Sequence, residues 1–308
     1  CKTFRFNCTF KIGKISLFLC EIIKFKNMKL IVDSGSTKSD WILFDSDGVF
    51  VNTFATLGLN PEVVSEDEIL KRLNISEDLM VLQTKVEEVH FYGSGCGTPR
   101  SKEMMRIALG KFFIATNSFV VKEDTYAAVF ATCKENEQAI VCINGTGSNC
   151  SYFNGKDVIQ VVDSLGYLAM DDCGGVQFGR EMIRAYFFKT MPEDLRLKFA
   201  ASYDLNSDTI KNRFYKTENP NAYLASFLPF LVENKNEPFF QELIDYQILF
   251  FVNNYIKQFE NFAEVPVHFV GSVAFLLQDN FEKILKQNGL MAGKFYQKPL
   301  DGLINFYK

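Results

Sequence analysis

Two short turns rich in Gly, Ser and Thr carry the residue types best suited to holding an anion. They lie at residues 33–38 and 144–149. Glycines leave the backbone N–H groups of a tight turn uncovered, and Ser and Thr add hydroxyl donors, so such turns can bind phosphate oxygens. Short glycine motifs also occur in ordinary hairpin turns, and for one turn alone both interpretations stay open. The residues expected to contact phosphate are Gly35, Ser36, Thr37, Lys38, Gly145, Thr146, Gly147 and Ser148, although Lys38 could instead simply be solvated.

The chain repeats the arrangement around these turns. In each half an apolar run leads into the turn, a second run leaves it, and an Asp-Gly or Asn-Gly pair then introduces a third run. Such pairs between apolar runs are strong hairpin signals. Both halves are therefore predicted to open with an antiparallel meander, whose third strands lie at residues 49–56 and 158–162. Two such turns facing one another across a cleft could grip a polyphosphate from both sides.

Three segments together resemble a known superfamily. Residues 33–38, 143–150 and 269–274 resemble, in order, the first phosphate loop, the second phosphate loop and the adenosine motif of the sugar kinase, Hsp70 and actin superfamily. Within it the chain is similar to the N-acetylglucosamine kinase branch of the BadF/BadG-type ATPases over about residues 28–308. The resemblance implies an α/β fold of duplicated ribonuclease H-like domains, the actin-like ATPase fold. It has two lobes, each with a mixed five-stranded sheet flanked by helices, and a nucleotide cleft between them.

The same resemblance implies the substrates and the residues that would bind them. ATP and Mg²⁺ are expected, with N-acetylglucosamine or a related amino sugar accepting phosphate at its 6-hydroxyl, and a homodimer is common in the family. Gly271 and Ser272 would lie at the adenosine, although Ser272 could equally be a helix cap. The turn that holds Asn60 could likewise be a plain turn before a helix. The expected sugar contacts are Asn60, Ser94, Asn144 and Asp172.

Two acids each have a structural and a chemical interpretation. Asp33 ends the first predicted strand beside a phosphate turn, where it would either bind Mg²⁺ through water or cap the turn. Asp124 follows a buried apolar run and precedes a predicted helix, so it could cap that helix. The resemblance instead makes Asp124 the general base, which accepts the proton of the sugar hydroxyl during phosphoryl transfer.

One segment departs from the family pattern. Where the family has Gly-Asp-Glu-Gly-Ser, this chain has residues 171–175, in which Asp171 replaces the first Gly and Cys173 replaces the Glu. The departure leaves two alternatives to a working kinase. One is a kinase-like sensor that binds sugar or nucleotide without turnover. The other is an iron–sulfur ATPase activator of a dehydratase that uses Cys173, although the second cysteine loop of those proteins is not apparent.

Composition excludes several classes of function. A chain of 308 residues suits two domains, and a hydrophobic content of 47% is typical of a globular protein. The net charge of −4 gives no electrostatic footprint for nucleic acid. Eight Cys without a CxxC pair, and only two His, argue against a zinc site and indicate a reducing compartment, hence the cytoplasm. No run of 18 apolar residues is present, so no membrane-spanning helix is expected.

The predicted boundaries follow from the two meanders. Met28 directly precedes the first clear strand, so residues 1–27 are expected to be a non-native or disordered extension. Helices are expected to fill residues 192–262, and residues 265–270 are expected to form the last strand. The predicted lobes are residues 28–137 and 138–291, with a last helix at about 292–308 that returns to the first lobe.

Overall fold

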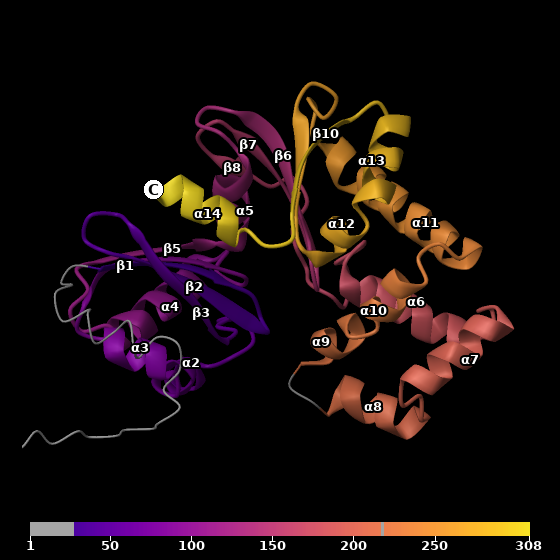
Figure 1. Cartoon of the computed structure of the whole chain (residues 1–308), viewed down its shortest axis with the longest axis horizontal. Coiled ribbons are helices and arrows are strands. Elements are labelled where there is room, and N and C mark those ends of the chain that lie inside the picture. Colours follow the sequence, from indigo (N-terminus) through magenta and orange to yellow (C-terminus); the bar gives the residue numbers. More distant parts are fainter. Residues whose placement is uncertain (1–27, 217–218) are drawn as a thin grey trace, which may run out of the picture. The chain divides into compact units, whose positions relative to one another are not determined.

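The computed structural model describes residues 28–216 and 219–308 (Figure 1). The expectation of a non-native or disordered extension at residues 1–27 therefore lies outside the described residues. The chain divides into two compact units, the first holding residues 28–122 and the second residues 123–307. Each unit is built around one sheet with its own buried core.

The first unit is a five-stranded sheet with helices packed on it. Strands β1 (Met28–Ser34), β2 (Lys38–Phe44) and β3 (Phe50–Leu57) form an antiparallel meander, and β4 (Val86–Gly93) pairs parallel to β1. Strand β5 (Ser118–Glu123) completes the order β3-β2-β1-β4-β5. The central strand β1 is apolar along most of its length because both of its faces are covered. The helices of this unit are α2 (Glu66–Asn74), α3 (Glu77–Leu82) and α4 (Pro99–Phe112).

The second unit is also built on a five-stranded sheet, with more helices. Strands β6 (Gln138–Asn144), β7 (Ser148–Asn154) and β8 (Val158–Ile159) form the antiparallel meander, and β9 (Pro266–Val270) pairs parallel to β6. Strand β10 (Met291–Tyr296) lies at the edge beside β9. The helices are α5 (Asp124–Thr132), α6 (Gly175–Phe187), α7 (Glu193–Ser202), α8 (Ser207–Tyr215), α9 (Pro220–Ala225), α10 (Leu228–Glu233), α11 (Pro238–Asn254), α12 (Ser272–Leu276), α13 (Gln278–Gln287) and α14 (Leu300–Tyr307).

The two sheets share one connectivity. Taken from its opposite edge, the second sheet has the order β8-β7-β6-β9-β10, which matches β3-β2-β1-β4-β5 strand for strand. In both sheets the first strand of the meander is central, and its turn to the second strand is a glycine turn. The predictions of an opening meander in each half and of two mixed five-stranded sheets flanked by helices are confirmed.

The end of the chain differs from the prediction. Strand β9 is not the last strand, because β10 pairs with it, and the helix expected from about residue 292 is limited to α14. Gly293 obscured this strand in the sequence, since glycine inside a strand usually marks an irregularity. The register between β9 and β10 indeed shifts after Ala292, and a β-carbon on Gly293 would lie 2.1 Å from His268 Nδ1.

The predicted helical stretch and one predicted strand are more divided or shorter than expected. Within residues 192–262, where helices were expected, residues 220–233 form two short helices, α9 and α10, because Pro229 lacks an N–H donor and starts a new helix. Helix α11 ends at Asn254 and a separate 3₁₀ turn follows at Ile256–Gln258. Strand β8 is limited to two residues at the sheet edge, where the exposed Ile159 and Val161 have no packed face to extend it.

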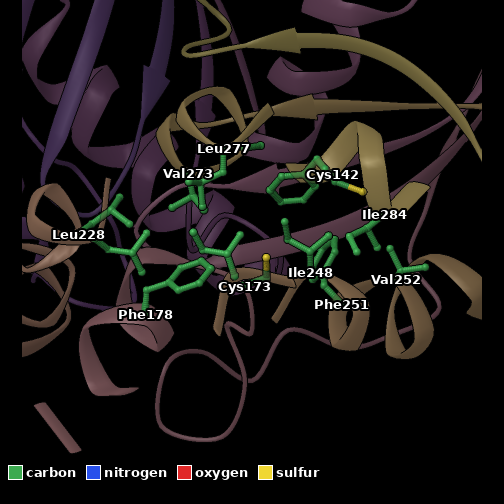
Figure 2. Close-up of a cluster of buried hydrophobic side chains, with 14 of the residues drawn as sticks. Cys142, Cys173, Phe178, Leu228, Ile248, Phe251, Val252, Val273, Leu277 and Ile284 are labelled. Carbon is green, nitrogen blue, oxygen red and sulfur yellow. The ribbon is translucent and has the colours of Figure 1, made fainter. Parts of the chain in front are cut away.

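The core of the second unit supports the strand that leads into the second glycine turn. Figure 2 shows side chains of β6, α6, α11, α12 and α13 meeting in this core, with Cys142, Phe178 and Phe251 among them. Burial of a large apolar side chain such as Phe251 contributes about 1.5–3 kcal/mol. Cys142 and Cys150 are register partners, and both thiols are buried, with their sulfur atoms 3.5 Å apart.

Helices α5 and α14 pack against each other within the second unit. The rings of Phe130 and Phe306 stack with centroids 4.6 Å apart, and a β-carbon on Gly302 would lie 2.3 Å from the backbone oxygen of Ala131. The two helices therefore form one close pair. The predicted lobe limits, 28–137 and 138–291, stay a prediction.

Candidate functional site

The first glycine turn joins β1 to β2 and leaves backbone donors available. Gly35 N–H donates to Lys38 O at 2.9 Å and Gly58 N–H donates to Thr37 O at 3.0 Å. The N–H groups of Ser36 and Thr37 have no acceptor among the described residues. A β-carbon on Gly35 would meet only Lys38 O, at an ordinary 3.6 Å, so packing does not require a glycine there. The turn therefore offers free donors beside a position where a side chain is absent.

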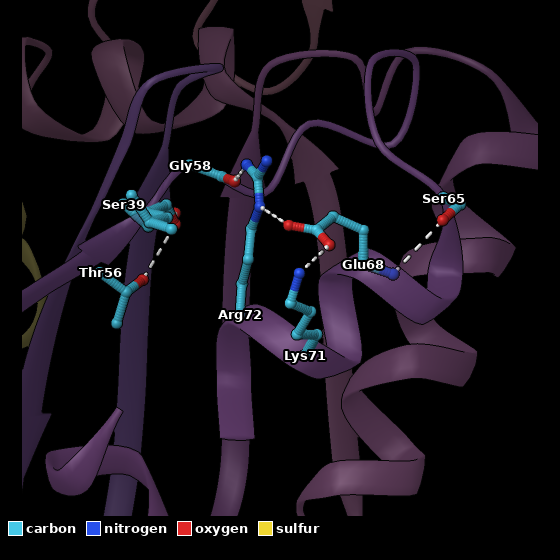
Figure 3. A network of polar contacts seen from close by, with 8 residues as sticks. Ser39, Thr56, Gly58, Ser65, Glu68, Lys71 and Arg72 are labelled. Atoms are coloured by element: carbon cyan, nitrogen blue, oxygen red, sulfur yellow. Dashed lines mark hydrogen bonds and ion pairs between the residues drawn. The ribbon is translucent and has the colours of Figure 1, made fainter. Parts of the chain in front are cut away.

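A largely buried arginine, Arg72, bonds to the segment that packs on this turn. A β-carbon on Gly58 would lie 2.4 Å from Gly35 O, so Gly58 must be a glycine for the two segments to approach. Arg72 Nη1 donates to Gly58 O at 2.7 Å, and Arg72 Nε donates to Glu68 Oε1 at 3.0 Å (Figure 3). The Arg72 side chain is only 11% exposed. Sequence reasoning missed this support, because Arg72 looked like an ordinary polar residue of a helix.

The structure brings three of the predicted binding residues of the first unit together. Asn60 Nδ2 donates to Ser36 Oγ at 2.8 Å and to Ser94 Oγ at 3.5 Å. Asn60 Oδ1 accepts from the N–H of Glu62 at 2.9 Å, which fixes the amide plane. Gly95 has a φ of +81°, and a β-carbon there would lie 2.0 Å from Asn60 Oδ1. The plain-turn interpretation of Asn60 therefore omits a polar cluster that joins the first turn to the end of β4.

Asp33 lies directly opposite another carboxylate. Asp33 on β1 and Asp40 on β2 are register partners, so their side chains are on the same face of the sheet. Two like charges in this position favour a cation nearby. Lys38 supplies one, because its Nζ lies 2.5 Å from Asp40 Oδ1. Asp40 was not predicted as a site residue, although its position opposite Asp33 across the predicted hairpin could have indicated it.

The second glycine turn joins β6 to β7 and also has available donors. Gly145 N–H donates to Gly147 O at 3.0 Å, whereas the N–H groups of Thr146 and Gly147 have no acceptor among the described residues. A β-carbon on Gly145 would meet no atom within 4 Å, but one on Gly147 would lie 2.6 Å from Asp171 Oδ2. Neither glycine has a positive φ. Packing therefore explains Gly147, while Gly145 has no structural reason to be a glycine.

The segment that departs from the family pattern packs directly on this turn. Gly175 N–H donates to Gly145 O at 2.8 Å, and Val176 N–H donates to Thr146 O at 2.9 Å. The Asn144 side chain is fully buried, and its Nδ2 donates to Cys173 O at 3.3 Å, while its Oδ1 has no partner among the described residues. The start of α6 is thereby tied to the second turn, and Asn144 joins the two.

The Asp171 carboxylate accepts a hydrogen bond from one of the backbone donors of the second turn. Its Oδ1 accepts from Ser148 N–H at 3.1 Å, and its backbone φ of +67° is in the left-handed region. Burial raises the pKa of Asp171 and the Asp172 carboxylate raises it further, while the Ser148 N–H lowers it. The sequence showed that a carboxylate had replaced a glycine, but not that this carboxylate would point into the predicted phosphate turn.

Cys173 is unsuited to the role of a cluster ligand. Its side chain is fully buried in the core of the second unit, and burial raises the pKa of the thiol well above its usual value. A buried, protonated thiol is inert. Across residues 28–216 and 219–308, no group of three or more His, Cys, Asp or Glu side chains is placed to hold a metal ion. The iron–sulfur alternative gains no support from this residue.

Asp172 is held by a tyrosine that sequence reasoning missed. Tyr255 Oη donates to Asp172 Oδ2 at 2.8 Å from the end of α11. Burial raises the pKa of Tyr255, and its hydrogen bond to Asp172 raises it further, so the phenol stays protonated and can donate. The Tyr255 ring stacks on Phe251 with centroids 4.7 Å apart. One oxygen of the Asp172 carboxylate is thus fixed by the fold.

The predicted adenosine motif lies beside the second turn. Gly271 follows β9, which pairs with β6, and a β-carbon on Gly271 would lie 2.3 Å from Asn144 O. Its φ of +124° also requires glycine. Gly271, rather than Ser272, is the N-cap of α12, and Ser272 is the first helical residue. The helix-cap interpretation of Ser272 is therefore wrong.

Asp124 is the first residue of α5, and Glu123 is the N-cap without a side-chain cap bond. Gln160 Nε2 donates to Asn149 Oδ1 at 3.2 Å and to Glu123 Oε2 at 3.5 Å. The start of α5 is thereby connected to β7, next to Ser148. The structure places Asp124 half-buried in the same unit as the second turn, and its role as a base stays a prediction.

Comparison with solved structures shows what the chain is similar to. A candidate N-acetylglucosamine kinase from Porphyromonas gingivalis matches with a TM-score of 0.84 and 33% identity, over 90% of this chain and 98% of that one. A candidate N-acetylglucosamine kinase from Chromobacterium violaceum matches with a TM-score of 0.65 and 15% identity, over 92% and 99% of the two chains. A glucokinase from Balamuthia mandrillaris in complex with glucose gives 0.53 and 11%, over 96% and 99%.

The last two similarities, at such low identity, concern the fold alone. Scans against models of protein families and against curated proteins gave no match. Within the part of the chain that the structure describes, every helix is too short or too polar to span a bilayer.

Proposed function

This chain belongs to the N-acetylglucosamine kinase-like family of sugar kinases with the actin-like ATPase fold, and we propose that it phosphorylates an amino sugar with ATP. The acceptor we propose is the 6-hydroxyl of N-acetylglucosamine or a related hexosamine. The similarity to the Porphyromonas gingivalis protein over 90% of the chain carries this proposal. The two glycine turns supply the local chemistry that such a reaction needs.

Phosphate binding is assigned to both turns. The N–H groups of Ser36 and Thr37 in the first turn, and of Thr146 and Gly147 in the second, have no acceptor among the described residues. Oriented backbone donors of this kind stabilise phosphate oxygens. Gly145 supports the assignment, because a β-carbon there would meet no protein atom within 4 Å. Where packing does not require a glycine, the absence of a side chain leaves room for a ligand to approach the backbone.

The remaining roles follow the same logic. Asp33 would hold Mg²⁺, and the opposed carboxylates of Asp33 and Asp40 suit a hard cation. When bound, this ion would neutralise charge on the transferring phosphate. Asn60, Ser94 and Asp172 would bind the sugar hydroxyls, and Asp124 would accept the proton of the hydroxyl that is phosphorylated. The predictions of a homodimer and of a cytoplasmic location remain predictions.

The test is release of ADP, measured in a coupled assay with a panel of hexosamines, for the wild type and for Asp124→Asn. Loss of a general base typically lowers turnover about 10²–10⁴-fold. The variant should therefore bind magnesium ADP like the wild type but lose most sugar phosphorylation. Asp194→Asn is the control, because Asp194 is likewise an acid in the first turn of a helix but lies exposed, away from both glycine turns in the sequence. Unchanged phosphorylation by Asp124→Asn would remove the residue from the mechanism.

A second candidate is a kinase-like sensor that binds its ligands without turnover. The observation that favours it is the Asp171 carboxylate on Ser148 N–H, where the family has a glycine. The same assay separates the two candidates. A wild type that binds N-acetylglucosamine and ADP in calorimetry, but releases no ADP from ATP with any hexosamine, would be a sensor.

A further inference from the structure

We propose that Asp171 sets the nucleotide affinity of the second glycine turn by competing with phosphate for its backbone donors. This inference rests on the proposed function, since it assumes that the turn binds a nucleotide phosphate. The carboxylate is therefore a built-in competitor, and its removal should strengthen binding.

The carboxylate lies where a phosphate would approach the turn. Its Oδ1 accepts from Ser148 N–H at 3.1 Å. All three of its outer atoms, Oδ1, Oδ2 and Cγ, would lie 2.6–2.8 Å from a β-carbon on Gly147. The Asp171 side chain thus covers the Gly147 and Ser148 part of the turn, while the N–H groups of Thr146 and Gly147 have no acceptor among the described residues.

Carboxylate and phosphate are competing ligands for such donors. Both are anions that accept hydrogen bonds from backbone N–H groups, and one N–H cannot serve both fully. The Ser148 hydroxyl is buried without a partner among the described residues, so another donor is located at the same place. A phosphate that displaced the carboxylate could use both the N–H and the hydroxyl of Ser148.

The fold holds the Asp171 carboxylate against the turn although burial and a neighbouring carboxylate disfavour its charge. The segment is fixed on both sides, by the left-handed φ of +67° at Asp171 and by the hydrogen bonds of Gly175 and Val176 to the turn. Burial and the neighbouring Asp172 disfavour the charged form of Asp171, and raise its pKa, while Arg180 and the Ser148 N–H favour it. The carboxylate therefore stays because of the local backbone, and a better acceptor can replace it.

The experiment is calorimetric titration of magnesium ADP and of adenosine into the wild type, Asp171→Asn and Asp171→Gly. Asp171→Gly also fits the left-handed φ, so it protects the test against misfolding. Asp157→Asn is the control, because it removes the same charge from an exposed turn. Hydrogen exchange of the Ser148 amide, compared between the wild type and Asp171→Gly, reports the contact itself without any nucleotide.

Relief of competition at one charged hydrogen bond should tighten ADP binding about tenfold in both Asp171 variants. Adenosine binding should be unchanged, since adenosine has no phosphate, and the Ser148 amide should exchange faster in Asp171→Gly. Equal or weaker ADP binding by both variants, with intact binding by the wild type, would overturn the inference and leave the proposed function standing. Absence of ADP binding in every protein, the wild type included, would overturn the proposed function and the inference with it.

Discussion

Replacement of Gly145 by alanine separates the binding role of the second turn from its structural role. The new methyl group would meet no atom within 4 Å, and the φ of Gly145 is not in the left-handed region. A Gly-to-Ala change at a permissive position is usually stabilising by about 0.4–1 kcal/mol, because it restricts the unfolded chain. We therefore expect Gly145→Ala to unfold at the temperature of the wild type or slightly above it.

Binding of nucleotide should change in the opposite direction. A methyl group on the open side of the turn would keep phosphate oxygens away from the N–H groups of Thr146 and Gly147. Loss of one hydrogen bond to a charged group costs about 1.5–3 kcal/mol, which is roughly a 10- to 150-fold increase in the dissociation constant. Calorimetric titration with magnesium ADP measures this change, and thermal unfolding of the same samples measures stability.

Two further glycines serve as controls for this variant. Gly110→Ala, in α4, should behave as the wild type in binding, because its β-carbon would meet only a Phe119 ring atom at 3.9 Å. Gly147→Ala should lower stability, because its β-carbon would lie 2.6 Å from the Asp171 carboxylate. If Gly145→Ala were as stable as the wild type and bound ADP equally well, phosphate could not lie on this turn.

Two other variants test the neighbouring features. Tyr255→Phe removes the hydroxyl that holds Asp172 at 2.8 Å but keeps the ring on Phe251, so the KM for the amino sugar should rise about fivefold or more with ADP affinity unchanged; an unaltered KM would separate Asp172 from sugar binding. Burial lowers the pKa of His268, so the unfolded chain binds the proton more readily and stability should fall as the pH drops below about 6.5. His268→Asn keeps an acceptor near Lys294 N–H but cannot gain a proton in this pH range. Denaturant titrations at pH 7.5 and 5 should show that the stability advantage of the wild type over this variant is smaller at pH 5. An equal advantage at both pH values would contradict the effect of His268 on stability.

The parts of the fold that the sequence predicts are those encoded by neighbouring residues. Apolar runs separated by glycine turns fix both meanders, because hairpin geometry depends on a few adjacent positions. The short turns at residues 35–37 and 145–147 are where the pattern placed them. The edge strand β10 was missed for the opposite reason, since its Gly293 is explained by contacts with the distant residues His268 and Val267 on β9.

The residues of the candidate site likewise divide into those that the sequence predicts and those that depend on contacts between distant segments. Asn60 and Ser94 were expected at the site from family resemblance, and the structure connects them through the Asn60 amide. Tyr255 could not be predicted, because 83 positions separate it from Asp172 and nothing in the local sequence marks a tyrosine at a helix end as a partner. The contact of Asp171 with Ser148 likewise depends on how α6 packs on the turn rather than on either segment alone.

The two units use one connectivity but support their turns differently, and this difference has a chemical consequence. In the first unit Gly58 packs on the turn and Arg72 bonds to Gly58 O, and the carboxylate that comes with this support, Glu68, is bonded to Arg72 and not to a backbone N–H of the turn. In the second unit the support is the start of α6, which brings the Asp171 carboxylate with it. On the proposed function, a substitution that removes this carboxylate would therefore strengthen phosphate binding at the second turn and leave the first turn unchanged. If the turns bind phosphate as proposed, the duplicated fold allows nucleotide affinity to be adjusted at one turn without altering the strands that carry the site.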